Sequence, residues 1–178
     1  MLSEPLFAVS AADVALTSDE WYTPRWLFAA AGIVFDMDVC APVDPAFRTC
    51  PAREYLTAVN DGLSVEWRGI VWCNPPYSNP RPWSERLIRH AAWMALVPAS
   101  CNTWRGELTG AADGVALMSI GARNGQAWAG FGRPDGSQTG WPFALCLLAR
   151  GEMCVEALSR AAAADPYAMG AYHVRPVS

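Results

Sequence analysis

Lysine is absent from this chain of 178 residues, so that arginine supplies all 13 basic side chains. Biased codon usage in a GC-rich genome is enough to produce this pattern. The formal net charge is -4 at pH 7, which argues against a strongly basic protein that coats nucleic acid nonspecifically. A local arginine face stays compatible with the composition.

Metal ligands are also scarce. The six cysteines include no C-x-x-C pair, and His90 and His173 are the two histidines. Structural zinc sites are built from clustered cysteines and histidines at characteristic spacings. The sequence therefore predicts no metal site, and thiols that lie in apolar runs are expected to be small, reduced core residues.

Long hydrophobic runs are missing too. The apolar stretch "FALCLLA" at 143–149 is far shorter than the roughly 20 residues of a membrane helix, and the N-terminus has acids where a signal peptide has a basic start. We therefore expect a cytoplasmic protein. The length suits one well-buried core, so residues 1–18 are expected to form an arm and residues 19–178 one domain.

Short apolar runs alternate with amphipathic stretches along the chain. Strands are expected at 33–39, 70–73, 94–99, 114–120 and 142–149, and helices within 18–32, 81–92, 102–112 and 152–164. The first helix is expected to have Thr23 as its cap, Pro24 as its first residue and Gly32 at its end. This alternation predicts an α/β domain with a mostly parallel sheet flanked by helices.

Three polar or breaker-rich segments follow or border these strands: "DMDVCAP" at 36–42, "NDGL" at 60–63 and "NPPYS" at 74–78. Ligands of open α/β sheets bind beyond the carboxyl ends of the strands. The three segments are therefore expected to converge on one edge of the sheet.

The two consecutive prolines of "NPPYS" stiffen the backbone and remove two main-chain donors. The side-chain oxygen of Asn74 and the carbonyl of Pro75 can accept the two N–H bonds of a planar amine, while Tyr77 offers a face for stacking. Such stacking contributes roughly 1–3 kcal/mol per base in single-strand binding sites. The segment is therefore typical of a site that holds an amine for reaction with an electrophile.

In this order, "DEWYTP" (19–24), "FDMDVCAP" (35–42), "NDGLSVEW" (60–67), "NPPYS" (74–78) and "LVPA" (96–99) resemble the phage-type DNA N6-adenine methyltransferase (Dam) family. The resemblance spans about residues 19–105 and is weaker to 150. It implies a Rossmann-like fold and the activity of an adenine-specific DNA-methyltransferase. Such an enzyme uses S-adenosylmethionine to methylate adenine N6 in DNA. The target base is then flipped into a pocket formed by the catalytic residues Asn74, Pro75, Pro76 and Tyr77.

The resemblance also implies which residues border the cofactor. Tyr22, Thr23 and Pro24 would lie at its methionine end, near a helix N-terminus, and Asp61 near its adenine. Asp36 and Asp38 match the acidic strand end, and either Asp44 or Glu54 would bind the ribose. The chain departs from the superfamily because the usual G-x-G turn is replaced by "DMDVCAPVD".

Simpler interpretations stay open for several of these features. "DG" at 61–62 is also a plain turn signal, Thr23-Pro24 a plain helix start, and the aspartates solvated strand-end acids. Arg86 and Arg89 could face phosphates or merely solvent. The Gly-rich segment 122–141 could touch DNA, close over the substrate or be an ordinary loop. Rival functions are methylation of cytosine N4 or protein glutamine, or a non-catalytic DNA-binding phage accessory protein; a homodimer is compatible with each.

Overall fold

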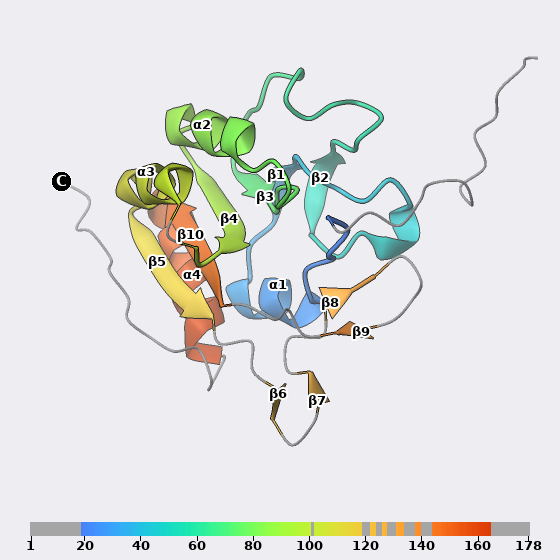
Figure 1. Ribbon diagram of the computed structural model, residues 1–178, viewed down its shortest axis with the longest axis vertical. Coiled ribbons are helices and arrows are strands. Elements are labelled where there is room, and N and C mark those ends of the chain that lie inside the picture. The colour runs from blue at the N-terminus through green and yellow to red at the C-terminus, as the bar shows by residue number, and fades with distance from the viewer. Residues whose placement is uncertain are drawn as a thin grey trace, which may run out of the picture.

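A computed structural model of the chain describes residues 19–100, 102–118, 122–123, 126–127, 131–133, 138–139 and 144–164. Figure 1 shows a sheet with helices packed around it. The expected N-terminal arm, residues 1–18, lies outside the described residues. No helix in the described part of the chain is long and apolar enough to cross a membrane.

The main sheet has six strands in the order β2-β1-β3-β4-β10-β5. These strands are β1 (Phe35–Asp38), β2 (Ala52–Tyr55), β3 (Val71–Cys73), β4 (Trp93–Pro98), β5 (Gly114–Met118) and β10 (Leu145–Arg150). The pairs β1–β2, β1–β3 and β3–β4 are parallel, whereas β10 is antiparallel to both β4 and β5. The expectation of a mostly parallel sheet is therefore confirmed only in part, because β10 runs against its neighbours.

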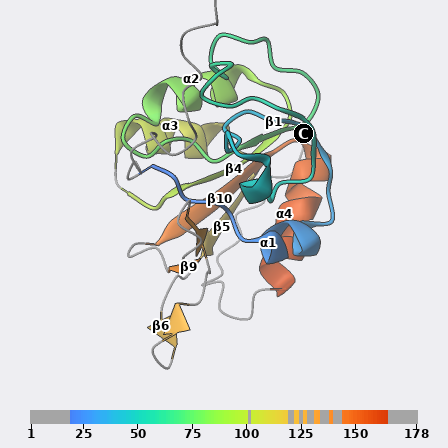
Figure 2. The same ribbon diagram turned by 90° about the vertical axis from the view of Figure 1, so that its right-hand side faces the viewer.

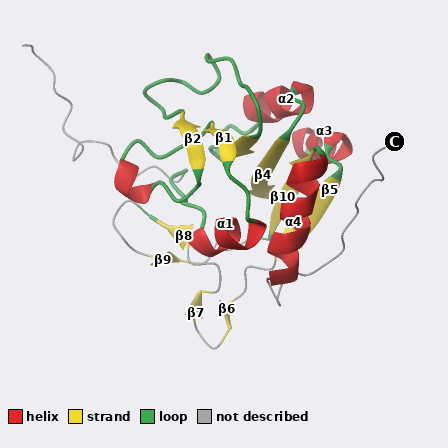
Figure 3. Cartoon of the chain, turned by 180° about the vertical axis from the view of Figure 1, so that it is seen from behind, coloured by secondary structure: helices red, strands yellow, loops and turns green. Residues whose placement is uncertain are grey.

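Helices cover both faces of this sheet, as Figures 2 and 3 show from the side and from behind. They are α1 (Arg25–Ala31), α2 (Arg81–Arg89), α3 (Thr103–Ala111) and α4 (Glu152–Ala164). Helices α1 and α4 pack on one face and α2 and α3 on the other. Side chains of β10 alternate between the two cores: Leu145 and Leu147 face α1 and α4, and Cys146 and Leu148 face α2 and α3. This two-sided burial explains why "LCLLA" is an unbroken apolar run.

The start of α1 differs from the expectation by one residue. Pro24 is the N-cap residue and the helix begins at Arg25, so the prediction that Thr23 caps the helix is wrong. Gly32 ends α1 as expected: it adopts a left-handed φ of 59°, and its N–H donates to the Phe28 carbonyl at 3.0 Å. Glycine reaches this conformation without the penalty that a Cβ brings.

Sequence reasoning missed strand β2 and four short strands. Strand β2 lies at the sheet edge and carries no fully buried side chain. Its sequence "AREY" therefore needs no apolar run, and none marked it as a strand. The segment expected as a loop at 122–141 contains two small antiparallel pairs in its described residues. These are β6 (Ala122–Arg123) with β7 (Gln126–Ala127), and β8 (Phe131–Gly132) with β9 (Gln138–Thr139).

Candidate active site at the carboxyl ends of the central strands

The strand order changes direction at β1. From β1 the chain passes first to β2 on one side and later to β3 on the other side. Such a switch point leaves a crevice beyond the carboxyl ends of the two diverging strands, which is where ligands of open α/β sheets bind. The segment 39–43 follows β1 at this edge, and "NPPYS" follows β3.

A pocket of about 420 Å³ opens here. Its walls come from residues 19–22, from the turn 39–43 after β1, from the stretch after β2, and from "NPPYS" and α2. The lining residues are Asp19, Glu20, Trp21, Tyr22, Val39, Cys40, Ala41, Pro42, Val43, Thr57, Ala58, Asp61, Gly62, Pro76 and Trp83. All three segments that were expected to converge, at 36–42, 60–63 and 74–78, thus contribute to one cavity.

Hydrogen bonds join "DEWYTP" directly to "NPPYS". The side-chain amide of Asn74 donates from Nδ2 to the Trp21 carbonyl at 2.7 Å. The Asp19 carboxylate accepts the Ser78 main-chain N–H at 2.9 Å and also the Ser78 hydroxyl. Segments more than 50 residues apart in sequence therefore form one unit at the site.

Within "NPPYS", the Asn74 amide has a fixed orientation. Because Nδ2 donates to a carbonyl, Oδ1 is the acceptor, and the Tyr77 hydroxyl donates to it at 2.9 Å. The same hydroxyl lies 3.4 Å from the Leu96 carbonyl, and burial raises the pKa of Tyr77. An amide oxygen has two lone pairs, so Oδ1 can accept a second donor. The stacking role of the Tyr77 ring stays a prediction, since part of that side chain packs against the core next to α1 and α4.

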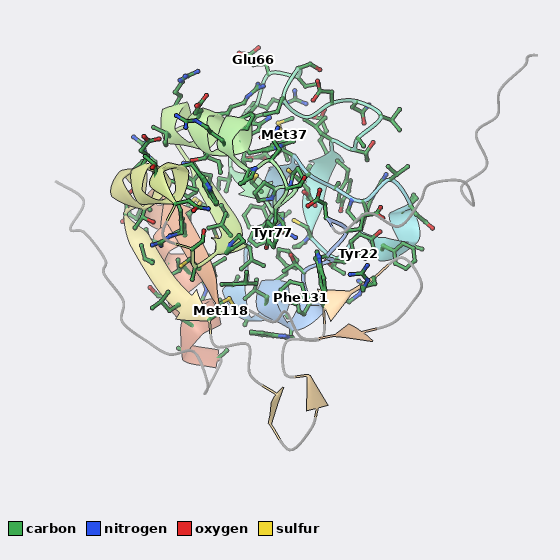
Figure 4. The ribbon with its side chains drawn as sticks, in the orientation of Figure 1. Tyr22, Met37, Glu66, Tyr77, Met118 and Phe131 are labelled. Atoms are coloured by element: carbon green, nitrogen blue, oxygen red, sulfur yellow. The ribbon has the colours of Figure 1, made fainter. Side chains whose placement is uncertain are left out.

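Tyr22 lines the pocket, and its place at the methionine end of a cofactor stays a prediction. Its main chain forms an isolated bridge with Gly132, and its ring stacks on Phe47 with centroids 5.0 Å apart. Burial, helped by the negative charges of Glu20 and Asp44, raises the pKa of Tyr22 to about 12. Figure 4 labels Tyr22 and Tyr77, which come from the two joined segments.

Thr23 and Pro24 do not line the pocket, although both follow Tyr22 directly. Thr23 is buried, and its carbonyl accepts the Thr49 hydroxyl at 2.6 Å. The hydroxyl of Thr23 itself has no hydrogen-bond partner among the described residues. A role for these two residues at the methionine end of a cofactor stays a prediction.

The "NDGL" turn is pressed against the end of β1. Asp61 has a positive φ of 50°, and its Oδ1 accepts the Leu63 N–H at 3.1 Å. A Cβ added to Gly62 would collide with the Val39 carbonyl oxygen and come within 3.0 Å of the Trp83 ring. Only glycine fits this contact. The "DG" pair that signals a turn in the sequence therefore also forms part of the pocket wall.

The strand-end aspartates have different surroundings. Asp36 pairs with Arg53, and its Oδ2 accepts the Ile70 N–H at 2.7 Å, which lowers the pKa of Asp36. Asp38 is only 4% exposed and accepts the Cys40 N–H at 3.2 Å. Burial raises the pKa of Asp38 to about 7. Neither carboxylate is among the described residues that line the pocket.

The two candidates for the ribose acid also lie outside the pocket lining. Asp44 is exposed and caps a short 3-10 helix, η1 (Pro45–Phe47), by accepting the Ala46 N–H at 2.8 Å. Glu54 pairs with Arg68 across the surface of the sheet edge. A ribose contact from either acid therefore stays a prediction.

Several pocket residues escaped the sequence reasoning. Thr57 follows β2, whose recognition as a strand would have drawn attention to it. Trp83 lies on α2, where an aromatic residue indicates core as readily as a pocket wall. Glu20 stands inside "DEWYTP", and its Oε2 is buried without a hydrogen-bond partner in the described structure. A buried acceptor of this kind is visible only in three dimensions.

Two arginines have roles that the sequence did not indicate. Arg86 donates to the Leu63 and Val65 carbonyls, and its guanidinium lies 4.6 Å from the Trp67 ring centroid. Arg86 is therefore not merely solvated, because it holds the loop that follows Gly62, and a phosphate contact by Arg86 stays a prediction. Arg133, from the Gly-rich segment, stacks over the Trp21 ring at 4.6 Å.

Comparison with known proteins is consistent with this geometry. A family model described as "DNA N-6-adenine-methyltransferase (Dam)" matches residues 12–121, which is more than half of the chain. The chain belongs to this family. The Dam match includes every residue that lines the pocket and the whole of "NPPYS".

One curated Dam relative matches at 37% identity over 75 residues. It is the DNA N-6-adenine-methyltransferase of Haemophilus phage HP1 (strain HP1c1), and the aligned part covers 39% of this chain and 41% of that protein. The chain thus spans about two fifths of the length of this relative. No solved structure matches the chain.

Proposed function

We propose that this Dam-family chain transfers a methyl group from S-adenosylmethionine to the N6 amino group of adenine in DNA. The observation that carries the proposal is that hydrogen bonds join "DEWYTP" to "NPPYS" at the carboxyl ends of β1 and β3, beside a pocket. The name of the phage HP1 relative supports the same activity. Membership of the Dam family supports both the substrate and the cofactor.

The fold supports a Rossmann-like methyltransferase architecture. Four neighbouring strands are parallel with the switch point at β1, and the antiparallel β10 is inserted between β4 and β5. Helices on both faces leave the carboxyl edge of the sheet accessible, as this class of fold requires for ligand binding.

The pocket suits the cofactor by size and by chemistry. Its volume of about 420 Å³ falls within the roughly 300–1,000 Å³ typical of small-molecule sites. Apolar side chains and main chain form most of the wall, and its ionisable side chains other than Tyr22 and Cys40 are acids, which suits a cationic ligand. When bound, S-adenosylmethionine supplies a methyl group that passes to the N6 lone pair as its bond to sulfur breaks, the electron pair stays on sulfur, and N6 releases a proton to water.

Asn74 and its neighbours would hold the amine. The Asn74 Oδ1, oriented by the Nδ2–Trp21 hydrogen bond, accepts one N–H of the adenine amine, and the Pro75 carbonyl accepts the other. Both acceptors stabilise the positive charge that develops on nitrogen. Positioning of the two reactants lowers the barrier further. The amine of a paired adenine lies inside the duplex, so the base is flipped into the site.

Target recognition forms part of the proposal. The Gly-rich segment reaches the site through Arg133, which contacts Trp21, and through the bridge between Gly132 and Tyr22. This segment, alone or with a second copy of the chain, would read the DNA around the flipped base. Methylation of a specific sequence is therefore expected to depend on it.

Methyl transfer from labelled S-adenosylmethionine to DNA, followed by digestion and mass spectrometry of the nucleosides, tests the proposed reaction. We expect the label in N6-methyladenine. Label in N4-methylcytosine, or in glutamine of a protein supplied as substrate, would identify another amine. A folded sample that binds S-adenosylmethionine with no measurable affinity in calorimetry would instead favour a non-catalytic accessory protein, for which the missing G-x-G turn is the main argument.

A further inference from the structure

The ionisable groups of the pocket carry charge of one sign. Asp19, Glu20 and Asp61 line it, and no arginine or histidine is among its described lining residues. A carboxylate-lined cavity attracts cations and repels phosphates, and this effect is stronger where protein replaces water. The lining therefore favours a cationic ligand over a nucleotide with free phosphates.

The three acids differ in their hydrogen bonding. Asp19 is engaged by the main chain and hydroxyl of Ser78, and Asp61 accepts the N–H of Leu63. Glu20 differs from both, because its Oε2 is buried and has no hydrogen-bond partner among the described residues. Glu20 is thus the pocket acid with one carboxylate oxygen that no donor of the described residues satisfies, and a turn of its side chain toward the pocket would bring that oxygen to a ligand.

An unpaired buried carboxylate oxygen is costly, because it loses water without gaining a donor. A positively charged ligand in the pocket would remove this cost. We propose that Glu20 receives a positively charged group of the cofactor, and that this contact gives the pocket its selectivity for charge. The inference rests on the proposed function, since it assigns a residue to the same cofactor pocket.

Two groups of S-adenosylmethionine are cationic at neutral pH: the α-ammonium and the sulfonium. The product, S-adenosylhomocysteine, keeps the α-ammonium but has a neutral thioether in place of the sulfonium. A contact between Glu20 and the sulfonium would therefore favour the substrate over the product, whereas a contact with the α-ammonium would strengthen the binding of both.

The test is isothermal titration calorimetry of S-adenosylmethionine and S-adenosylhomocysteine with the wild type, Glu20→Gln and a matched control, Glu156→Gln. Glu156 lies on α4 and is exposed, so its variant removes one negative charge away from the pocket. We expect Glu20→Gln to weaken S-adenosylmethionine binding roughly 10- to 100-fold, the loss of a charge-assisted hydrogen bond. The control is expected to bind like the wild type.

The product titration then identifies the group. An equal loss for both ligands assigns the contact to the α-ammonium, and a loss confined to S-adenosylmethionine assigns it to the sulfonium. Unchanged affinity of Glu20→Gln for both ligands would overturn the inference while leaving the proposed function intact. A wild type that binds neither ligand would contradict the proposed function itself.

Thermal unfolding without ligand separates this role from a structural one. Because the wild-type carboxylate has an unsatisfied oxygen, Glu20→Gln is expected to unfold at the same temperature as the wild type or a higher one. The increase in unfolding temperature on adding S-adenosylmethionine is expected to be smaller in the variant. A clear drop in the unfolding temperature of the ligand-free variant would overturn the inference by showing that Glu20 supports the fold.

Discussion

Asp38 makes the stability of the protein depend on pH in a direction opposite to that of most carboxylates. Burial raises the pKa of Asp38 from 3.8 to about 7. Between these values the folded protein keeps a proton that the unfolded chain releases, so the free energy of unfolding falls as pH rises. With a shift of about 3 units and about 1.4 kcal/mol per unit, the total change is about 4 kcal/mol between pH 4 and pH 7.

Urea unfolding of the wild type and of Asp38→Asn across this pH range measures the effect. Asparagine can still accept the Cys40 N–H through Oδ1 but does not titrate. The stability of the variant relative to the wild type is therefore expected to rise by about 4 kcal/mol from pH 4 to pH 7 and then level off.

Asp36→Asn is a control of opposite sign, because the Ile70 N–H holds the pKa of Asp36 below its usual value. Its stability relative to the wild type is expected to fall as pH rises through the acid range. A difference between Asp38→Asn and the wild type that stays constant with pH would refute the reasoning about Asp38.

Two further substitutions test how the wall of the pocket is built. Gly62→Ala would force the turn away from the Val39 carbonyl. We therefore expect the free energy of unfolding in urea to fall by about 1–3 kcal/mol and cofactor binding in calorimetry to weaken. Wild-type values in both measurements would contradict the close contact. Arg86→Met removes two charge-assisted hydrogen bonds and the contact with Trp67, so we expect the free energy of unfolding to fall by about 2–3 kcal/mol. Arg89 is exposed, and Arg89→Met is expected to change the stability little. Equal effects of the two variants would show that Arg86 does not hold the loop.

Sequence reasoning was most successful where local patterns and buried strands coincide. The apolar runs at 70–73, 94–99 and 142–149 correspond to β3, β4 and β10. The convergence of three segments on one sheet edge followed from their positions after or near the predicted strands. The direction of β10 was not predictable in this way. The apolar run of β10 is that of any strand buried on both faces. Its antiparallel direction is seen only in its pairing with β4 and β5.

Site residues that depend on tertiary contacts were harder to predict. The spacing of Arg86 and Arg89 gives two cations on one helix, yet only the fold shows that Arg86 binds carbonyls of a distant loop. Glu20 has no feature in the sequence that separates it from Asp19. In the structure, Asp19 has donors around it and Glu20 has a buried oxygen without one.

The central claim is that Asn74 holds the amine that receives the methyl group. Single-turnover methyl transfer to DNA, measured for the wild type and Asn74→Ala at saturating S-adenosylmethionine, tests it most directly. Loss of one preorganised group that stabilises developing charge lowers rates by roughly 10²–10³-fold, so we expect a decrease of that order in the variant with cofactor affinity close to that of the wild type. An Asn74→Ala variant that methylates adenine at the full wild-type rate would contradict the account.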